Sequence, residues 1–374
     1  MGQHRNIALD IIRTIAIILV LLNHSVESLF KLEEYDYAVA YNSMNNSGIT
    51  LTFTLGRLGV PLFLMLTGYL LLNRDFDKPG AIKKFWLKNT LSLIITWEIW
   101  LFLYNLFLCF YNNTPFDVTG WIRQMCFVEL PEITHSWYLP MIIGIYIFIP
   151  FIAKGIHNVP KYALYIMLAV CYAALFIVPS INVFYSTFDI EPLTLRATPV
   201  FWATYNGTFL LLGHLLNIRT KAIRCLPLID IAVCVTGIWV SVWLQVMLHA
   251  GGSQYNIWYS FFTLPPVAYC LFDLLVRIKP QRGVAFIKRI SICSFGIYLI
   301  HRPLQMLLEM EGSFFTNMCS TLPSLWTMWL LLVFSFFISY GITEGLGAIP
   351  IIGNLLVRIR VNIKKSSNQQ KPMA

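Results

Sequence analysis

Residues 7–29 read IALDIIRTIAIILVLLNHSVESL, and this apolar run decides the fold class of the chain. An α-helix needs about 20 mostly apolar residues to cross the hydrocarbon core of a membrane, and this run is long enough. It is too long for the apolar part of a typical secretory signal, and no small-residue cleavage site follows it. We therefore expect residues 7–29 to remain in the protein as its first membrane-spanning helix.

The composition of the whole chain is that of an integral membrane protein. Of the 374 residues, 57% are apolar and 12% are charged, whereas a soluble domain carries about 25% charged residues. The net charge of +9 lies in short gaps between apolar runs, so we expect membrane lipid as a partner and no nucleic acid. The eight cysteines form no C-x-x-C pair and no metal-ligand spacing, which predicts neither a disulfide framework nor a metal site.

Nine more apolar runs follow, so the sequence predicts an all-α, polytopic transmembrane helical bundle of about ten spans. Cytoplasmic loops are enriched in Lys and Arg. With the N-terminus inside, the outer segments hold only Lys31, Arg123 and Arg196, which predicts that both chain ends are cytoplasmic. We expect one transmembrane domain over residues 1–363 and a polar cytoplasmic tail over residues 364–374. The predicted spans are 7–29, 49–72, 86–110, 136–153, 162–179, 199–217, 228–249, 256–276, 290–309 and 325–345.

The first span carries three ionisable residues. A charge near the bilayer centre costs at least about 2.5 kcal/mol, so such a group usually faces the bundle interior and has a partner. Asp10 and Arg13 are i,i+3 neighbours that can pair on one helix face. Arg13 and His24 are eleven residues apart, which is three turns plus about 20° and about 16 Å along the axis. All three share one stripe; the alternative is an interfacial ion pair and a histidine in an ordinary interhelical hydrogen bond.

Polar groups also lie in later spans. Arg57 stands beside Gly59 and Pro61, and irregular backbone at membrane depth is tolerated where it lines a cavity. The alternative for Arg57 is a snorkelling side chain next to a proline kink. His301 and Arg302 are adjacent near the middle of the ninth predicted span, where a lipid-facing position is hard to explain.

Two further positions are open to a simpler explanation. Trp137 and Tyr138 begin the fourth span, where an interfacial aromatic belt would account for them equally well. Glu344 lies near the cytoplasmic end of the last span, where it can pair with Arg13 or meet solvent.

At these residues the chain resembles the acyltransferase-3 family of membrane acyltransferases. The most specific element is the first-span pattern L-D-x-x-R-x10-H. The others are R-x-G-V-x-x-F followed by a small residue and G-F/Y, then W-F/Y-L, and then Y-L-x-H. The matching residues are Leu9, Asp10, Arg13 and His24; Arg57, Gly59, Val60, Phe63, Thr67, Gly68 and Tyr69; Trp137, Tyr138 and Leu139; and Tyr298, Leu299 and His301.

The resemblance implies that residues 1–363 form the acyltransferase domain of a ten-helix enzyme of the bacterial inner membrane. Such enzymes move an acyl group, commonly acetyl, from a cytoplasmic donor such as acetyl-CoA to a hydroxyl of a cell-surface glycan or lipid-linked sugar. Acceptors in the family include O-antigen, enterobacterial common antigen and capsule. The chain departs from the family pattern at Thr67, where Ser is usual, and after Glu344, where a proline often follows.

We expect the catalytic residues to be Asp10, Arg13 and His24. Arg13, fixed by Asp10 and assisted by the basic inner loops, would hold the phosphates of the donor. His24 would act as general base toward the acceptor hydroxyl, or as a transient acyl carrier. The predicted substrate-binding residues are Arg57 as an oxyanion donor, Trp137 and Tyr138 as a stacking surface, His301 as an aid to proton transfer, and Glu344.

Two other function classes stay open at this point. Buried charges and kinked helices also suit a transporter of a lipid-linked sugar or glycan. Transporters often have two related halves, whereas the pattern from Asp10 to His24 occurs once. A non-catalytic assembly or sensor protein is the third possibility, and labelling or hydrolysis of acetyl-CoA by the purified protein would separate the enzyme from both.

Overall fold

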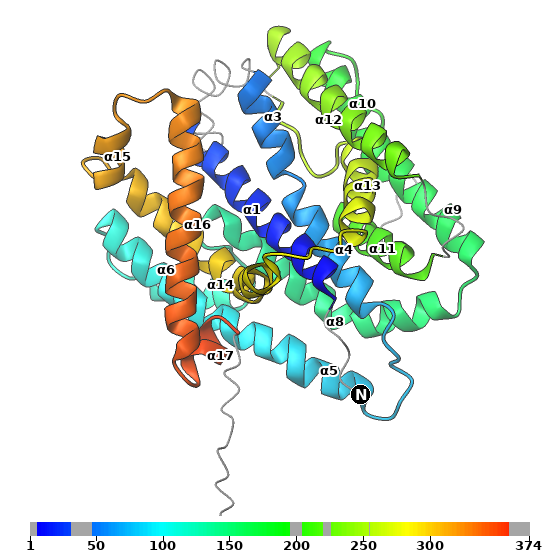
Figure 1. Cartoon of the computed structure of the whole chain (residues 1–374), viewed down its shortest axis with the longest axis horizontal. Coiled ribbons are helices and arrows are strands. Elements are labelled where there is room, and N and C mark those ends of the chain that lie inside the picture. The colour runs from blue at the N-terminus through cyan, green and yellow to red at the C-terminus, as the bar shows by residue number, and fades with distance from the viewer. Residues whose placement is uncertain (1–5, 31–46, 195–203, 220–225, 254, 359–374) are drawn as a thin grey trace, which may run out of the picture.

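The computed structural model describes residues 6–30, 47–194, 204–219, 226–253 and 255–358, and this part of the chain forms helices and no strand. Eight helical segments are long and apolar enough to cross a membrane, so the chain is an all-α, multi-pass membrane protein (Figure 1). The eight segments are α1 (Ile7–Leu29); α3 and α4 (Ser47–Gly56, Gly59–Leu71); α5, η1 and α6 (Ala81–Phe85, Trp86–Thr90, Leu91–Asn112); η2 and α8 (Thr134–Trp137, Tyr138–His157); α9, η3 and α10 (Lys161–Tyr172, Ala173–Ile177, Val178–Thr187); α12 (Pro227–Ala250); α14 (Val284–Glu309); and α16 (Ser324–Ala348).

Two of the ten predicted spans contain shorter helices. The range 199–217 contains α11 (Tyr205–Ile218), and its first residues lie outside the described part of the chain. The range 256–276 contains only the 13 residues of α13 (Leu264–Val276). Two prolines open α13, and proline cannot continue a helix from upstream, so residues 255–263 take a non-helical path.

In the described part of the chain, three short helices lie between or after the predicted spans. The polar tail predicted for residues 364–374 is not among the described residues. The short helices are α7 (Val118–Met125), α15 (Phe314–Cys319) and α17 (Ile352–Leu356).

Helix α1 lies at the centre of the bundle, in contact with α3, α4, α13, α14 and α16. The close approach of α3 and α4 depends on Gly56 and Gly59. A Cβ atom at either glycine would lie 2.8 Å from backbone atoms of Asn23 or Val20 on α1. Small residues of this kind let membrane helices pack backbone to backbone, and here they bring Arg57 next to α1.

The helix of the second span is interrupted at Arg57, between α3 and α4, where the sequence predicts irregular backbone. In a continuous helix the N–H of residue 61 would bond to the carbonyl of Arg57, but Pro61 has no N–H to donate. The break leaves Arg57 between two helices, where the residue is 6% exposed and its side chain pairs with Glu27 of α1.

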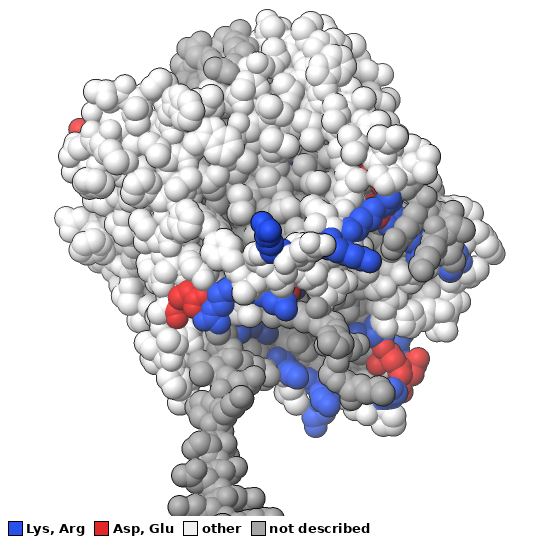
Figure 2. Space-filling model, viewed as in Figure 1, with Lys and Arg blue, Asp and Glu red and all other residues white. Residues whose placement is uncertain are grey.

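Basic side chains gather at one end of the bundle. In Figure 2 the Lys and Arg side chains on the visible face lie in its lower half, with almost no charge above them. The exposed lysines Lys83, Lys84 and Lys88 of α5 and η1 lie at this end, which we call the basic end. The distribution is the one that the positive-inside rule requires of a membrane protein.

Candidate active site

A cavity of about 530 Å³ extends from the basic end along α1. Arg13, Asn89 and Arg358 line one part of it, and Tyr138 and Tyr298 line another. The walls between them are mainly aliphatic and aromatic side chains of α1, α4, α6, α8 and α14. The cavity therefore combines a cationic mouth with an apolar interior.

Arg13 at the mouth is held by Asp10 and Ser291. Nη1 of Arg13 donates to Oγ of Ser291 at 3.0 Å, and that hydroxyl donates to Oδ1 of Asp10 at 2.6 Å. Nη1 of Arg13 also lies 3.7 Å from Oδ1 of Asp10, which is 1% exposed. The predicted pairing of Asp10 with Arg13 is confirmed, and Ser291 of α14 completes it.

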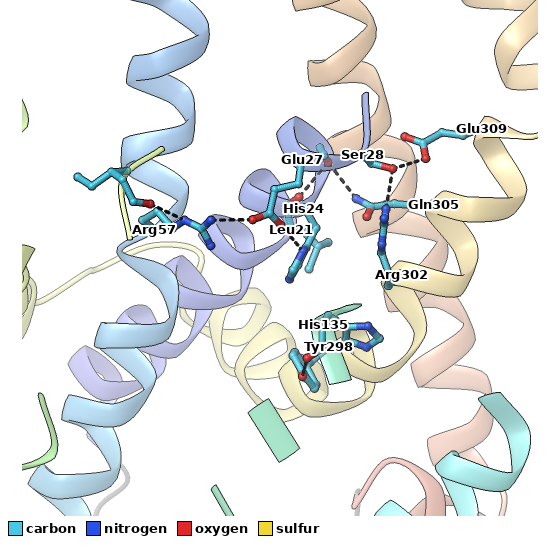
Figure 3. Close-up of polar contacts among 12 residues, drawn as sticks. Leu21, His24, Glu27, Ser28, Arg57, His135, Tyr298, Arg302, Gln305 and Glu309 are labelled. Atoms are coloured by element: carbon cyan, nitrogen blue, oxygen red, sulfur yellow. Dashed lines mark hydrogen bonds and ion pairs between the residues drawn. The ribbon is translucent and has the colours of Figure 1, made fainter. Parts of the chain in front are cut away.

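Farther along α1, Glu27 links His24 to Arg57 (Figure 3). Nδ1 of His24 lies 2.8 Å from Oε2 of Glu27, and Nη2 of Arg57 lies 2.9 Å from Oε1. Nε of Arg57 donates to the carbonyl of Ile257 at 3.1 Å, and the guanidinium lies 4.5 Å from the centre of the Phe53 ring. A buried guanidinium fixed on several sides favours the ionised form of the carboxylate it pairs with.

Three buried histidines from separate segments meet beside this carboxylate. The His24 ring centre lies 5.3 Å from that of His301 on α14 and 6.1 Å from that of His135 on η2, and the latter two are 5.0 Å apart. Nδ1 of His301 donates to the carbonyl of Tyr298 at 2.6 Å, which makes Nε2 an acceptor. Nε2 of His135 lies 3.3 Å from the hydroxyl of Tyr104.

Two nitrogens of this cluster point to a polar ligand. Nδ1 of His135 and Nε2 of His301 are buried and have no hydrogen-bond partner within the described residues. Buried polar atoms are almost always satisfied, so unpartnered ones are typical of positions that a substrate or water completes. Within the described part of the chain, no three His, Cys, Asp or Glu side chains are placed to hold a metal ion.

Tyr298 lines the cavity and contacts the histidines, and Tyr138 packs against it. Their ring centres are 5.6 Å apart, and the Tyr298 ring lies 5.2 Å from His135, whose carbonyl accepts a hydrogen bond from the Tyr298 hydroxyl at 2.6 Å. Val20, which also lines the cavity, precedes His24 by about one turn of α1. Val20 is therefore the lining residue nearest to His24 along α1, and His24 itself does not line the cavity.

The structure brings His24, Arg57 and His301 together, and it packs Trp137 edge to face against Tyr138 with ring centres 6.1 Å apart. Tyr138 lines the cavity, whereas Trp137 packs against Tyr259 with ring centres 5.8 Å apart. Tyr259 lies in the segment beside Arg57, 5.2 Å from its guanidinium.

Glu344 lies apart from both groups. Its carboxylate accepts hydrogen bonds from Nε of Arg289 at 2.5 Å and from Nη2 of the same guanidinium. It does not line the cavity, and the pairing with Arg13 that the sequence leaves open is replaced by this one. Arg289 is two residues before Ser291 on α14, so the two side chains face different sides of that helix.

Two residues of the site do not follow from the motifs. Glu27 is three residues after His24, so the i,i+3 rule applied once more along α1 would have found it. His135 precedes Trp137 at the edge of a span and looks like part of an interfacial belt. No local signal in the sequence places it against His301.

Arg302, the neighbour of His301, points away from the histidines. Its Nη1 donates to Oγ of Ser28 at 2.6 Å, and that hydroxyl donates to the carboxylate of Glu309 (Figure 3). This second polar group ties α14 to the end of α1.

A family model described as an acyltransferase domain matches residues 6–344, which is nearly the whole chain. No curated protein and no solved structure matches this chain. The matched range contains Arg13 at the mouth of the cavity, the link from His24 through Glu27 to Arg57, and all three clustered histidines. The chain therefore belongs to the acyltransferase-3 family of membrane acyltransferases, as its first-span motif predicts.

Proposed function

We propose that this enzyme transfers an acetyl group from acetyl-CoA to a hydroxyl of a cell-surface glycan or lipid-linked sugar, in the bacterial inner membrane. The basic end would face the cytoplasm, where the donor is made, and the acceptor would enter from the other end. The observation that carries the proposal is the cavity between Arg13 and the two tyrosines that adjoin the histidines.

The cavity suits an acyl-CoA in charge and in length. A guanidinium at the mouth binds phosphate oxygens well, and apolar walls suit the uncharged pantetheine arm. Arg13 and His24 are eleven residues apart on one helix, or about 16 Å, which is comparable with an extended pantetheine arm. Phosphates held at Arg13 would therefore put the thioester near Tyr138 and Tyr298, next to His24.

His24 is suited to the role of general base. Nδ1 of His24 lies 2.8 Å from a carboxylate, which only accepts hydrogen bonds, so in this proposal Nδ1 carries the hydrogen and Nε2 is the basic nitrogen. An imidazole oriented in this way by a carboxylate is the arrangement used by hydrolases that activate a hydroxyl. Because Arg57 is engaged with Glu27 and Ile257, we assign it to holding Glu27 rather than to the oxyanion.

The reaction then follows in one exchange. Nε2 of His24 takes the proton of the acceptor hydroxyl while the hydroxyl oxygen attacks the thioester carbonyl. The carbon–sulfur bond breaks, and the imidazolium returns the proton to the leaving thiolate. The products are the acetylated sugar and free CoA.

The acceptor side offers aromatic surfaces for a sugar. Trp137 and Trp258 both pack against Tyr259, with ring centres 5.8 and 5.2 Å away. Aromatic rings present apolar faces with polar edges, which suits a carbohydrate ring. These side chains border Arg57, so a bound sugar would lie near the His24 end of the site.

The test is turnover of radiolabelled acetyl-CoA by the purified protein in lipid nanodiscs, with a surface-glycan extract as acceptor and release of CoA as the readout. Wild type should consume acetyl-CoA, and Arg13→Ala should need a far higher acetyl-CoA concentration to reach the same rate. His157→Ala is the matched control, because His157 is exposed on α8 and outside the site. Failure of the wild-type protein to bind or consume acetyl-CoA would rule out the proposed donor.

A further inference from the structure

We propose that residues 349–358, which follow the last span, form part of the donor site, and that Arg358 binds a phosphate of the acyl-CoA together with Arg13. This proposal rests on the proposed function and deepens it. The segment lies beyond the family match, which ends at residue 344, so family membership does not imply it.

The segment turns back as α17 and is held in place by α6. Oγ1 of Thr96 donates to the carbonyl of Leu355, and Nε1 of Trp100 donates to the carbonyl of Leu356, both at 2.8 Å. The last carbonyls of a helix have no partner within it, so the two bonds complete the end of α17. Both donors are buried, which makes their loss costly and the attachment specific.

The packing continues through Val357, which is 1% exposed and lines the cavity. It fits against Gly296 of α14, where a Cβ atom would lie 2.9 Å from Cγ1 of Val357. The residue immediately before Arg358 is therefore fixed to the wall of the cavity.

Arg358 itself lines the same cavity as Arg13. Its guanidinium lies 5.8 Å from the centre of the Phe295 ring, which belongs to the same lining. The backbone φ of Arg358 is 56°, in the left-handed region that residues other than glycine rarely adopt. Such backbone is strained and persists where the surrounding structure imposes it, often at ligand sites.

The charge of the cavity selects the ligand. Two arginines and Asn89 line the cavity, and none of the described residues that line it is acidic. Coenzyme A carries a diphosphate and a separate 3′-phosphate, so it can engage two guanidinium groups at once. A phospholipid headgroup offers the same phosphate chemistry to Arg358, and the experiment must separate the two sources.

The test is calorimetric binding of CoA and of pantetheine, which has no phosphate, to the full-length protein in nanodiscs of phosphatidylcholine alone or with phosphatidylglycerol. Arg358→Gln should weaken CoA binding about tenfold, the loss of one charged hydrogen bond, and leave pantetheine binding unchanged. Arg358→Lys should bind CoA with an affinity between those of wild type and Arg358→Gln. In turnover assays the KM for acetyl-CoA should rise while kcat at saturation stays the same.

Two further variants guard against trivial explanations. Arg282→Gln removes an exposed arginine that does not line the cavity, and it should bind CoA like wild type. Thr96→Val removes the bond to Leu355 without changing charge, so it should raise the KM with kcat unchanged even if Arg358→Gln does not insert.

The outcomes separate this proposal from the proposed function. If wild type binds CoA and Arg358→Gln binds it equally well, the role of Arg358 is overturned and the donor stands. If wild type does not bind CoA, both fail. An affinity loss that appears only with phosphatidylglycerol, or equally for pantetheine, would assign Arg358 to lipid or to the fold and overturn the proposal.

Discussion

Oε2 of Glu27 lies 2.8 Å from Nδ1 of His24, and Glu27 follows His24 by about one turn of α1. The other oxygen of the same carboxylate lies 2.9 Å from Nη2 of Arg57. One acidic side chain therefore fixes the ring orientation of the proposed base and joins it to a buried cation.

Replacing Glu27 by Gln keeps the shape of the side chain but removes its charge. The amide can donate to Nδ1 of His24 as well as accept, so the basic tautomer is no longer fixed. We expect kcat to fall by about 10²-fold or more at equal insertion, because general-base catalysis contributes about 10²–10⁴-fold. A Glu27→Gln enzyme with wild-type kcat would show that His24 does not depend on this carboxylate.

The pair formed by Glu27 and Arg57 should behave as a coupled unit in stability. Removing one partner of a buried ion pair typically costs about 3–5 kcal/mol, because the other charge stays buried. Glu27→Gln and Arg57→Gln should each lower the thermal unfolding temperature, and the double variant should lose less than their sum. Strictly additive losses would mean that the two groups do not interact in the folded protein.

Ser291→Ala should affect donor binding and not the chemical step. The hydroxyl bridges Arg13 and Asp10, and its loss removes about 1 kcal/mol of positioning at the mouth. Steady-state kinetics should show the KM for acetyl-CoA rising about fivefold with kcat unchanged. A drop in kcat with constant KM would place Ser291 in the chemistry instead.

Tyr298→Phe removes the hydroxyl that donates to the carbonyl of His135 at 2.6 Å. The aromatic ring that lines the cavity and contacts the histidines remains, so donor binding should be unchanged. We expect kcat to fall about tenfold, the rate equivalent of one lost hydrogen bond of about 1.4 kcal/mol. If only the KM changes, Tyr298 acts as cavity lining and not as support for His135.

Glu344→Gln should have little effect on acetyl transfer, although the sequence pattern favours a substrate-binding role. Its carboxylate pairs with Arg289, which is largely exposed, and such pairs contribute about 0–1 kcal/mol. Acetyl-CoA turnover within about twofold of wild type is expected. Loss of turnover with unchanged unfolding temperature would return Glu344 to the site.

The helical periodicity of α1 explains why much of the site could be predicted from the sequence. Asp10, Arg13 and His24 lie on one continuous helix, so their shared stripe depends only on local geometry. Their partners on α14 are remote in sequence, with Ser291 separated from Asp10 by 281 residues. Periodicity gives no information on such contacts, and the position of His135 beside His301 depends on tertiary packing in the same way.

The span count shows a similar limit. An apolar run predicts burial, but it does not distinguish a full span from a shorter helix preceded by a buried non-helical segment. The eighth predicted span divides in this way, and Pro265 and Pro266 are the local signal for it. The non-helical part supplies the Ile257 carbonyl that accepts a hydrogen bond from Arg57.

The most direct test of the account is mass spectrometry of the surface glycans of cells that carry wild type, His24→Ala or His157→Ala at equal levels in the membrane. The account predicts acetylated glycan with wild type and with His157→Ala, and loss of that acetylation with His24→Ala. Full acetylation by His24→Ala would contradict it.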